Sequence, residues 1–206
     1  MWQEPVRAVH ASCPGRNLIP KKEHVVRIVK LDLDGPLLIA PDIFRDERGF
    51  FLESYNAVRY QEAGIRETFV QDNHSRSIKG TLRGLHYQSQ PGQAKLVRVT
   101  VGRIWDVSVD IRPNSSTFGR WQGVELDADK CEQLYVPVGS AHGFCVLSDA
   151  AEVQYKVSTP YDAKTECSLS YADPDLAVRW PIADPIVSAR DMQAESFASF
   201  RARVAP

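Results

Sequence analysis

Short segments in which hydrophobic and polar residues alternate make up most of the chain, and turns containing glycine or proline separate them. The most regular segment is residues 102–112, GRIWDVSVDIR. In an extended strand, its tryptophan, its valines and its last isoleucine share one face, while Asp106, Ser108 and Asp110 share the other. We expect the first face to lie in the core. The second face is either exposed to solvent or the polar lining of a cavity.

The same alternation predicts several other elements. A hairpin is expected around the turn at residues 46–49, and another around the turn at residues 90–92. Residues 54–64 suit a short helix, with Ser54 as its N-cap and Gly64 just beyond its last turn. Further strands are expected at residues 25–33, 120–126, 134–147 and 151–158.

Many short strands with little helix favour a mainly β protein, an antiparallel β-sandwich or barrel. A jelly roll with a cavity between its sheets suits polar faces that point inward. We expect a polar leader at residues 1–27 and a single domain at residues 28–206. In the tail of that domain, Phe197, Phe200 and Val204 recur at helical spacing, which predicts a docked amphipathic helix.

Composition and charge narrow the function. The formal net charge of −1 gives no global field that would favour nucleic acid or an anionic membrane surface. No run approaches the ~18 apolar residues of a membrane span. The 4 cysteines show no CxxC spacing, and a chain of 206 residues needs no disulfides. We therefore expect free thiols and a cytoplasmic protein.

The stretch from residue 71 to residue 99 carries more polar chemistry than a hairpin stem requires, and a small-molecule pocket would explain it. Arg83 and His86 pose a geometric problem there, because an ideal strand places residues three apart on opposite faces. A bulge at Gly84 would bring both to one face. The polar residues of the stretch are Gln71, Asn73, His74, Arg83, His86 and Lys95.

Several separated motifs resemble one family, the dTDP-4-dehydrorhamnose 3,5-epimerases. The resemblance extends from about residue 41 to residue 191, and leaves out the leader and the last fifteen residues. Two positions depart from the family pattern: Pro160 stands where a second aromatic is common, and Arg190 where a lysine is common. The motifs, in chain order, are DERGFFLESY, FVQDNHSRS, LRGLHYQ, KLVRVTVGRIWDVSVDIRP, PVGSAHGF and AEVQYK.

The resemblance implies a metal-independent, cupin-type jelly roll without cofactors, usually a homodimer, that acts on a dTDP-linked 4-keto-6-deoxyhexose. It implies that His86 is the base, paired with Asp191, that Tyr155 is the proton donor, and that Tyr161 stacks on the thymine. The residues implied to contact the nucleotide sugar are Arg48, Glu53, Gln71, Asp72, Asn73, Arg83, Lys95, His142 and Glu166, and Arg190 is assigned to the same set.

This chemistry suits these residue types. Inverting a carbon next to a ketone means removing an acidic C–H proton and returning one from the opposite face. Histidine is the side chain whose pKa lies near neutrality, and a carboxylate such as Asp191 fixes its tautomer. Lys95 can stabilise the enolate oxygen, and Tyr155 can return the proton. Arginines such as Arg83 and Arg48 suit a diphosphate.

Three alternatives compete with this interpretation. A metal-dependent cupin would need clustered histidines, but a single histidine, His86, stands where an HxH pair is expected, and only His74 and His142 could join it. A jelly roll that only binds a ligand would not need His86, Lys95, Tyr155 and Asp191 together. The third alternative, an epimerase acting at one carbon of a related dTDP-sugar for antibiotic or surface-glycan synthesis, stays open.

We expect inversion at carbons 3 and 5, because nothing in the sequence distinguishes the two positions beside the ketone. The substrate would be dTDP-4-dehydro-6-deoxy-D-glucose, and the product dTDP-4-dehydro-L-rhamnose. We also expect a homodimer in which the hairpin at residues 41–51 crosses to the partner, so that Arg48 and Glu53 reach the neighbouring site.

Overall fold

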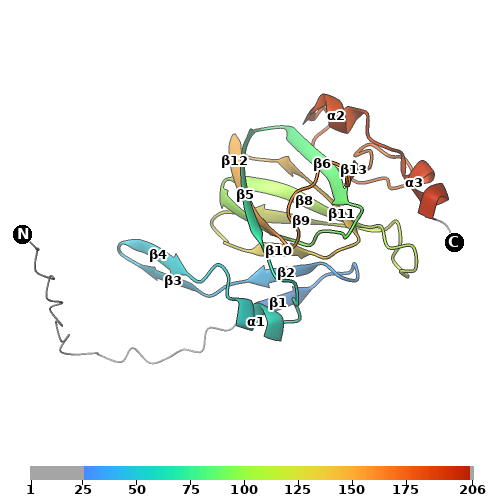
Figure 1. The fold of residues 1–206 in the computed structure, drawn as a ribbon. Helices are drawn as coiled ribbons and strands as arrows, with labels where there is room; N and C mark the ends of the chain where they lie inside the picture. Colours follow the sequence, from blue (N-terminus) through green and yellow to red (C-terminus); the bar gives the residue numbers. More distant parts are fainter. Residues whose placement is uncertain (1–25, 205–206) are drawn as a thin grey trace, which may run out of the picture.

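The alternating segments pair into two stacked antiparallel β-sheets in the computed structural model, which describes residues 26–204 (Figure 1). The first sheet has the order β1 (Arg27–Lys30), β2 (Leu37–Ala40), β10 (Gln133–Val136), β7 (Lys95–Val101), β12 (Ala150–Val157) and β5 (Gln71–Ile78). The second has the order β13 (Glu166–Ser168), β6 (Thr81–Gln88), β11 (Ser140–Val146), β8 (Arg103–Asp110) and β9 (Trp121–Asp127), with β14 (Ile186–Val187) parallel to β6. The predicted mainly β, jelly-roll type of sandwich is confirmed.

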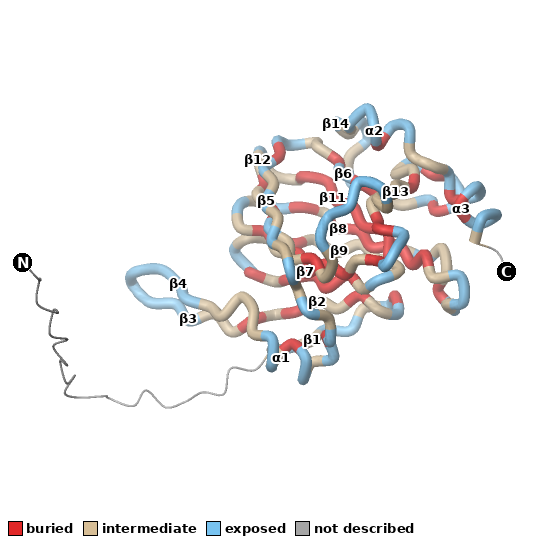
Figure 2. The backbone as a smooth tube through the Cα atoms, viewed as in Figure 1, coloured by how far each residue is buried: buried red, intermediate tan, exposed pale blue. Residues whose placement is uncertain are grey.

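Three hydrophobic clusters hold the layers together, and the buried segments run through the centre of the sandwich (Figure 2). The cluster between the sheets includes Val97, Val99, Ile104 and Val153. The outer face of the first sheet packs on the segment that contains α1 (Ala57–Glu62). The outer face of the second sheet packs on the C-terminal segment, which contains α3 (Phe197–Val204).

Strand β8 shows which of the two faces predicted for it is core. Val107 and Val109 pack on the cluster that includes Phe197 and Phe200 of α3, as expected for the hydrophobic face. The polar face is not exposed to solvent. Its three residues are 0–1% exposed and lie on the side that faces the first sheet: Asp106, Ser108 and Asp110.

Both helices predicted from the sequence are present, but one predicted cap is wrong. Helix α1 begins later than predicted, because the side chain of Asn56 accepts from the N–H groups of Val58 and Arg59. Ser54 is therefore not the N-cap; its carbonyl accepts instead from Gln133 Nε2, at 2.7 Å. The glycine beyond the helix, Gly64, has φ +97°, as expected at this position.

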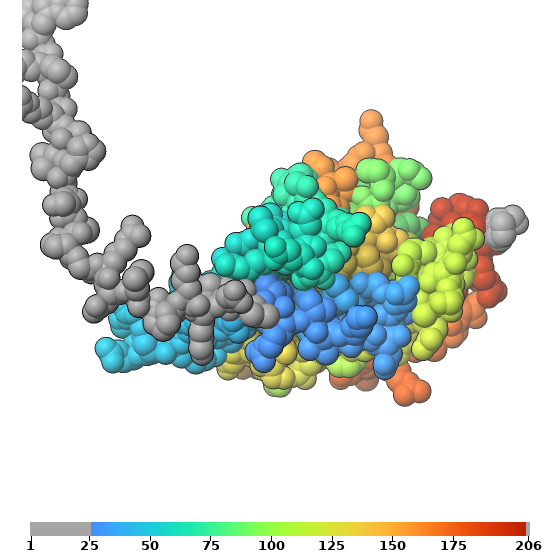
Figure 3. Space-filling view, turned by 90° about the horizontal axis from the view of Figure 1, so that it is seen from below, coloured from blue at the N-terminus to red at the C-terminus, as the bar shows by residue number. Residues whose placement is uncertain are grey.

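A two-stranded hairpin extends from the body, formed by β3 (Ile43–Asp46) and β4 (Gly49–Leu52) (Figure 1). In the space-filling view this hairpin, in light blue, lies at the opposite end of the molecule from the red C-terminal segment (Figure 3). The predicted leader falls almost entirely on residues 1–25, outside the described residues. Within residues 26–204, no helix is long and apolar enough to cross a membrane.

Candidate active site

A pocket of about 220 Å³ opens between the two sheets, and side chains from both sheets line it. Strand β6 of the second sheet supplies His86, and strands β5, β7 and β12 of the first sheet supply side chains opposite to it. The lining residues are Gln71, Asn73, His86, Tyr87, Gln88, Gln93, Lys95, Tyr155, Tyr161 and Glu166. Seven of these were named from the sequence as contacts or catalytic groups.

His86 and Asp191 form a hydrogen-bonded pair at one side of this pocket. The distance from His86 Nε2 to Asp191 Oδ1 is 2.6 Å, and the Asp191 side chain is only 5% exposed. Asp191 lies in α2 (Ala189–Met192), whose N-cap Ser188 fixes the start of the helix. Burial raises the pKa of Asp191, but the hydrogen bond and charge of His86, together with hydrogen bonds from Gly84 and Ser188, more than offset this, and the pKa lies below its usual value. The carboxylate is therefore ionised beside the imidazole.

A bulge in β6 brings Arg83 and His86 to the same side of the second sheet. His142 of β11 pairs with His86, yet Phe144, two residues on, pairs with Arg83, so β6 carries one extra residue. Gly84 lies in that interval with φ +129°, and a Cβ there would lie 2.5 Å from the Cα of Gly143. Only glycine fits this position.

The side chain of Arg83 points toward the first sheet, because it is hydrogen-bonded to a residue of that sheet. Arg83 Nε donates to Ser77 Oγ, 3.0 Å away on β5 of the first sheet. His86 faces the same sheet, since it shares its pocket with Lys95 and Tyr155. The bulge expected from the parity of these residues is therefore present.

Lys95 and Tyr155 face His86 from the first sheet, where their strands β7 and β12 are neighbours. Lys95 is buried, and its Nζ donates to the carbonyl of His86 at 3.3 Å. Burial lowers the pKa of Lys95 to about 8, while Asp106 and Glu166 oppose that change. Burial raises the pKa of Tyr155, so its phenol keeps its proton at neutral pH.

The rim of the pocket carries hydrogen-bonding and aromatic groups. Gln71 Nε2 donates to Asn73 Oδ1 at 2.8 Å, and the backbone N–H of Tyr161 donates to Gln71 Oε1 at 3.2 Å. Arg190 Nη1 lies 2.6 Å from Glu166 Oε2. The ring of Tyr161 is exposed, as a surface on which a planar base could stack.

Six residues predicted to contact a nucleotide sugar are not in the lining of this pocket. Two of them, Arg83 and Arg190, line an adjoining hollow that also contains His86. Arg48 and Glu53 belong to the hairpin segment, where Arg48 pairs with Asp46 and Glu53 pairs with Arg59. His142 is buried behind the pocket, with Nε2 bonded to Asp106. Asp72 lies on the opposite face of the first sheet.

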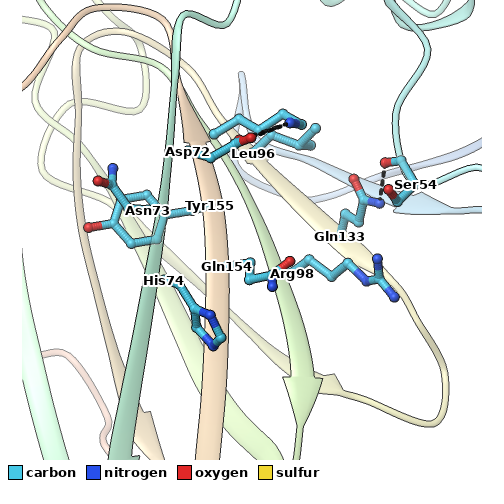
Figure 4. A pocket seen from close by; sticks show the side chains of 10 residues that line it. Ser54, Asp72, Asn73, His74, Leu96, Arg98, Gln133, Gln154 and Tyr155 are labelled. Atoms are coloured by element: carbon cyan, nitrogen blue, oxygen red, sulfur yellow. Dashed lines mark hydrogen bonds and ion pairs between the residues drawn. The ribbon is translucent and has the colours of Figure 1, made fainter.

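Asp72 points to the outer face of the first sheet, because its neighbours Gln71 and Asn73 point inward and strand residues alternate. There it pairs with Lys156 at 2.8 Å and lines a second hollow of about 250 Å³. Figure 4 shows this hollow, with Asp72, Gln154 and Arg98 on one side of the strands and the ring of Tyr155 on the other. The structure thus separates Asp72 from His86 by the thickness of a sheet.

Sequence reasoning did not name Tyr87, Gln88 and Gln93 as site residues, although all three line the pocket. Gln88 follows His86 by two residues on one strand, and this parity could have identified it. No comparable signal marks Gln93, since it lies outside the strands, between β6 and β7. Within residues 26–204, no group of three or more histidine, cysteine, aspartate or glutamate side chains is arranged to hold a metal ion.

Comparisons with known proteins identify a matching family model and similar sequences. The family model of dTDP-4-dehydrorhamnose 3,5-epimerase matches residues 30–199. The chain is 47% identical to the dTDP-4-dehydrorhamnose 3,5-epimerase of Shigella flexneri, over 84% of this chain and 96% of that protein. It is 39% identical to a dTDP-4-dehydrorhamnose 3-epimerase of Streptomyces niveus, over 85% of this chain and 86% of that protein.

A solved structure gives the same result. The dTDP-6-deoxy-D-glucose-3,5-epimerase of Legionella pneumophila, in complex with dTDP-4-keto-L-rhamnose, superposes with a TM-score of 0.84. Its sequence is 47% identical, and the match covers 88% of this chain and 97% of that one.

Proposed function

Because the chain belongs to the dTDP-4-dehydrorhamnose 3,5-epimerase family, we propose that it inverts carbons 3 and 5 of dTDP-4-dehydro-6-deoxy-D-glucose, giving dTDP-4-dehydro-L-rhamnose. The chain is an isomerase of the epimerase class. The observation that carries the mechanism is the His86–Asp191 pair, which faces Lys95 and Tyr155 across one pocket.

His86 is the base in this proposal. Its Nε2 is bonded to Asp191, which leaves Nδ1 with the lone pair that takes the proton from the carbon beside the ketone. As the C–H bond breaks, its electron pair forms the enolate, and the ketone oxygen becomes negative. Asp191 holds the tautomer and stabilises the imidazolium that results.

Lys95 and Tyr155 complete the cycle. Lys95 donates to the enolate oxygen while the negative charge is present. Tyr155, in the opposite sheet from His86, returns a proton to the other face of the carbon, and the C–H bond re-forms with inverted configuration. Before the second carbon reacts, the phenolate of Tyr155 takes a proton from solvent and the imidazolium of His86 gives its proton to solvent.

The nucleotide part of the substrate requires cationic and aromatic partners. Arg83 and Arg190 flank His86 in an adjoining hollow of about 360 Å³, and both can bind phosphate oxygens. Tyr161 can stack on the base, and Gln71 and Asn73 supply hydrogen bonds beside it. The bound product in the Legionella pneumophila structure supports a site of this kind.

Inversion at both carbons is favoured over inversion at one. The 3,5-epimerase of Shigella flexneri is 47% identical, whereas the 3-epimerase of Streptomyces niveus is 39% identical. A coupled assay tests this choice: dTDP-4-dehydro-6-deoxy-D-glucose, the enzyme, NADPH and a reductase that accepts only the doubly inverted sugar. NADPH oxidation is the expected result. Its absence, with a singly inverted product accumulating, would identify a single-carbon epimerase.

Histidine geometry supports turnover without a metal. His86 is engaged by Asp191, His142 by Asp106, and His74 lies on the outer face beside Glu152, so these three do not converge. Turnover should therefore persist after exhaustive chelation. Loss of activity on removal of a stoichiometric metal, and its recovery on adding the metal back, would contradict this.

A homodimer is the proposed assembly, with the β3–β4 hairpin reaching the partner. The hairpin exposes Phe50 at 53% and Phe51 at 66%, and the Arg48 side chain at 85%, which is unusual for a segment without a partner surface. Glu53 lies just beyond the hairpin. Sedimentation should give twice the mass of the chain, and a fully active monomer at nanomolar concentration would refute the exchange.

The cytoplasm is the proposed location. Cys131, Cys145 and Cys167 are free thiols in the described part of the chain, as expected in a reducing compartment.

A further inference from the structure

Two glutamines line the active-site pocket, and neither has a role in the proton transfers. Gln88 follows His86 by two residues on β6, and Gln93 precedes Lys95 of β7 by two residues. Lys95 Nζ is bonded to the carbonyl of His86, so these two residues lie at one level of the pocket. Two residues of extended chain span about 6.6 Å, so both glutamines lie one step beyond that level, toward the loop that joins β6 to β7.

Each amide is held by the segment at residues 158–165, which joins β12 to β13. The hydroxyl of Thr165 donates to Gln88 Oε1, and Gln93 Nε2 donates to the carbonyl of Thr159 at 2.8 Å. These two bonds determine which group of each amide is left for the pocket. They leave the NH₂ group of Gln88, which is a donor, and the Oε1 atom of Gln93, which is an acceptor.

Both of these groups lack a protein partner. Within residues 26–204, neither Gln88 Nε2 nor Gln93 Oε1 forms a hydrogen bond. The Gln88 side chain is only 9% exposed, and buried polar groups in folded proteins are nearly always paired. A bound ligand that supplies the two missing partners would explain the arrangement.

One acceptor and one donor together match a hydroxyl group, which accepts one hydrogen bond and donates another. A phosphate or ketone oxygen only accepts, so it would pair with Gln88 and leave Gln93 without a partner. The chemistry of the two amides therefore points to a hydroxyl of the substrate.

The position of the glutamines points to the hexose rather than to the nucleoside. Strands β6 and β7 are interior strands of their sheets, whereas β5 and β13 are edge strands. Tyr161, the stacking residue for the base, is 55% exposed and is bonded to Gln71 on the edge strand β5. The base thus lies at the open side of the pocket, and the hexose lies further in, beside His86 and the two glutamines.

The reaction itself distinguishes the two hydroxyls of the hexose. Carbon 3 inverts, so its hydroxyl changes direction during the reaction. Carbon 2 does not react, and its hydroxyl can keep the same two hydrogen bonds through both inversions. A fixed donor and a fixed acceptor therefore suit the 2-hydroxyl.

We propose that Gln88 and Gln93 bind the 2-hydroxyl of the hexose: Gln88 Nε2 donates to its oxygen, and its hydrogen is donated to Gln93 Oε1. This inference rests on the proposed function, because it places the reacting hexose between His86 and Lys95. It makes the two glutamines specificity-determining residues, which select sugars that carry a 2-hydroxyl over 2-deoxy sugars.

The test compares two substrates, dTDP-4-dehydro-6-deoxy-D-glucose and its 2-deoxy analogue. The kcat/KM for deuterium exchange at carbon 5 is measured by proton NMR, because carbon 5 is remote from the altered position. Wild type should prefer the 2-hydroxy sugar by about 100-fold, about tenfold for each hydrogen bond.

Variants of the two glutamines should remove this preference in steps. Gln88→Met and Gln93→Met keep the length of the side chain and remove its hydrogen bonds, and each should lower the preference to about tenfold. The double variant should prefer the 2-hydroxy sugar by less than about threefold. Comparing the preference between variants cancels any difference in intrinsic reactivity between the two sugars.

Gln133→Met is the matched control. Gln133 is 1% exposed and also bonds a loop carbonyl, that of Ser54 at 2.7 Å, but it lies on the outer face of the first sheet. This variant should lower stability and leave the preference at the wild-type value. A fall in preference here would show that loss of any buried amide has the same effect, and would overturn the inference.

The outcomes separate the inference from the proposed function. If wild type converts both sugars equally well, or if the glutamine variants slow both sugars by the same factor, the glutamines only hold the 158–165 segment and the inference is wrong. If Gln88→Met does not fold, the preference of Gln93→Met decides in the same way. If wild type converts neither sugar, the proposed function itself fails.

Discussion

The space between the two sheets has an apolar end and a polar end, although the same strands build both. Along β7, Val97 and Val99 pack in the hydrophobic cluster, while Lys95 lines the pocket. Along β8, Ile104 is in the cluster, and Asp106, two residues on, is part of the polar end. Each strand thus changes from apolar core to buried polar residues within two residues.

The difference shows how the fold divides stability from chemistry. At the apolar end, burial of side chains removes hydrocarbon from water and stabilises the sandwich. At the polar end, burial opposes the charged forms of Lys95 and Asp191, and hydrogen bonds or neighbouring charges must offset it. Substitutions at the two ends should therefore affect different quantities.

The largest expected effect is at the polar end, for His86→Asn. The variant removes the base but can still donate a hydrogen bond to Asp191, so its free energy of unfolding should change by less than about 1 kcal/mol. Turnover should fall by about 10²–10⁴-fold or more, as for loss of a positioned acid–base group. Steady-state kinetics and urea unfolding measure the two quantities. Retention of a tenth of the activity would exclude His86 as the base.

At the apolar end, Ile104→Ala should show the reverse. Ile104 is fully buried, and such a truncation lowers the free energy of unfolding by about 2–5 kcal/mol. The kcat/KM of the folded fraction should stay within about threefold of wild type, because no contact with the pocket is lost. Ile104→Val is the control, with an expected loss of about 0.5–1.5 kcal/mol. A large fall in kcat/KM without loss of stability would show that the two ends are not separable.

The hydroxyl of Tyr155 lies where the two ends meet, since its ring packs against the apolar cluster and the residue lines the pocket. Tyr155→Phe keeps the ring, so stability should hardly change. Proton removal by His86 should continue, while formation of inverted sugar should fall by about a hundredfold. Comparing deuterium wash-in with product formation separates the two steps. An unchanged ratio of the two rates would mean that another group returns the proton.

The sequence predicted which residues point inward more reliably than it predicted what they meet there. Alternation in β8 correctly grouped Asp106 with Ser108 and Asp110, but could not distinguish solvent from a buried cavity, because both accept polar residues. The parity conflict between Arg83 and His86 could be resolved by a bulge at Gly84, and the structure contains one there. Parity could equally have shown that Asp72 faces away from its two neighbours.

Other features depend on contacts between distant segments, which no local pattern contains. Ser54 and Asn56 are both good N-cap residues; Asn56 caps the helix, and the carbonyl of Ser54 is bonded to the distant Gln133. The pairing of His142 with Asp106 likewise depends on the register of β11 against β8. Short sequence motifs identify candidate residues, whereas the residues to which they hydrogen-bond are determined by the three-dimensional fold.

The smallest expected effect is on the pH dependence: titration of Lys95 should change stability and kcat/KM in opposite directions. The pKa of Lys95 is about 8 in the folded chain and near its ordinary value of ~10.4 when unfolded. Between these values the unfolded state binds more protons, so stability rises with pH while kcat/KM falls above about pH 8. Urea midpoints and kcat/KM at several pH values measure both. Lys95→Met should lack the rise in stability, and the same rise in that variant would assign it to another group.

The most direct test of the central claim, that one His86-centred site exchanges protons at both carbons beside the ketone, is proton NMR of the reaction in deuterated water. With wild type, deuterium should appear at carbon 3 and at carbon 5 of dTDP-4-dehydro-6-deoxy-D-glucose, and with His86→Asn at neither. Exchange at one carbon only after complete conversion, or exchange at both carbons at the wild-type rate with His86→Asn, would contradict the account.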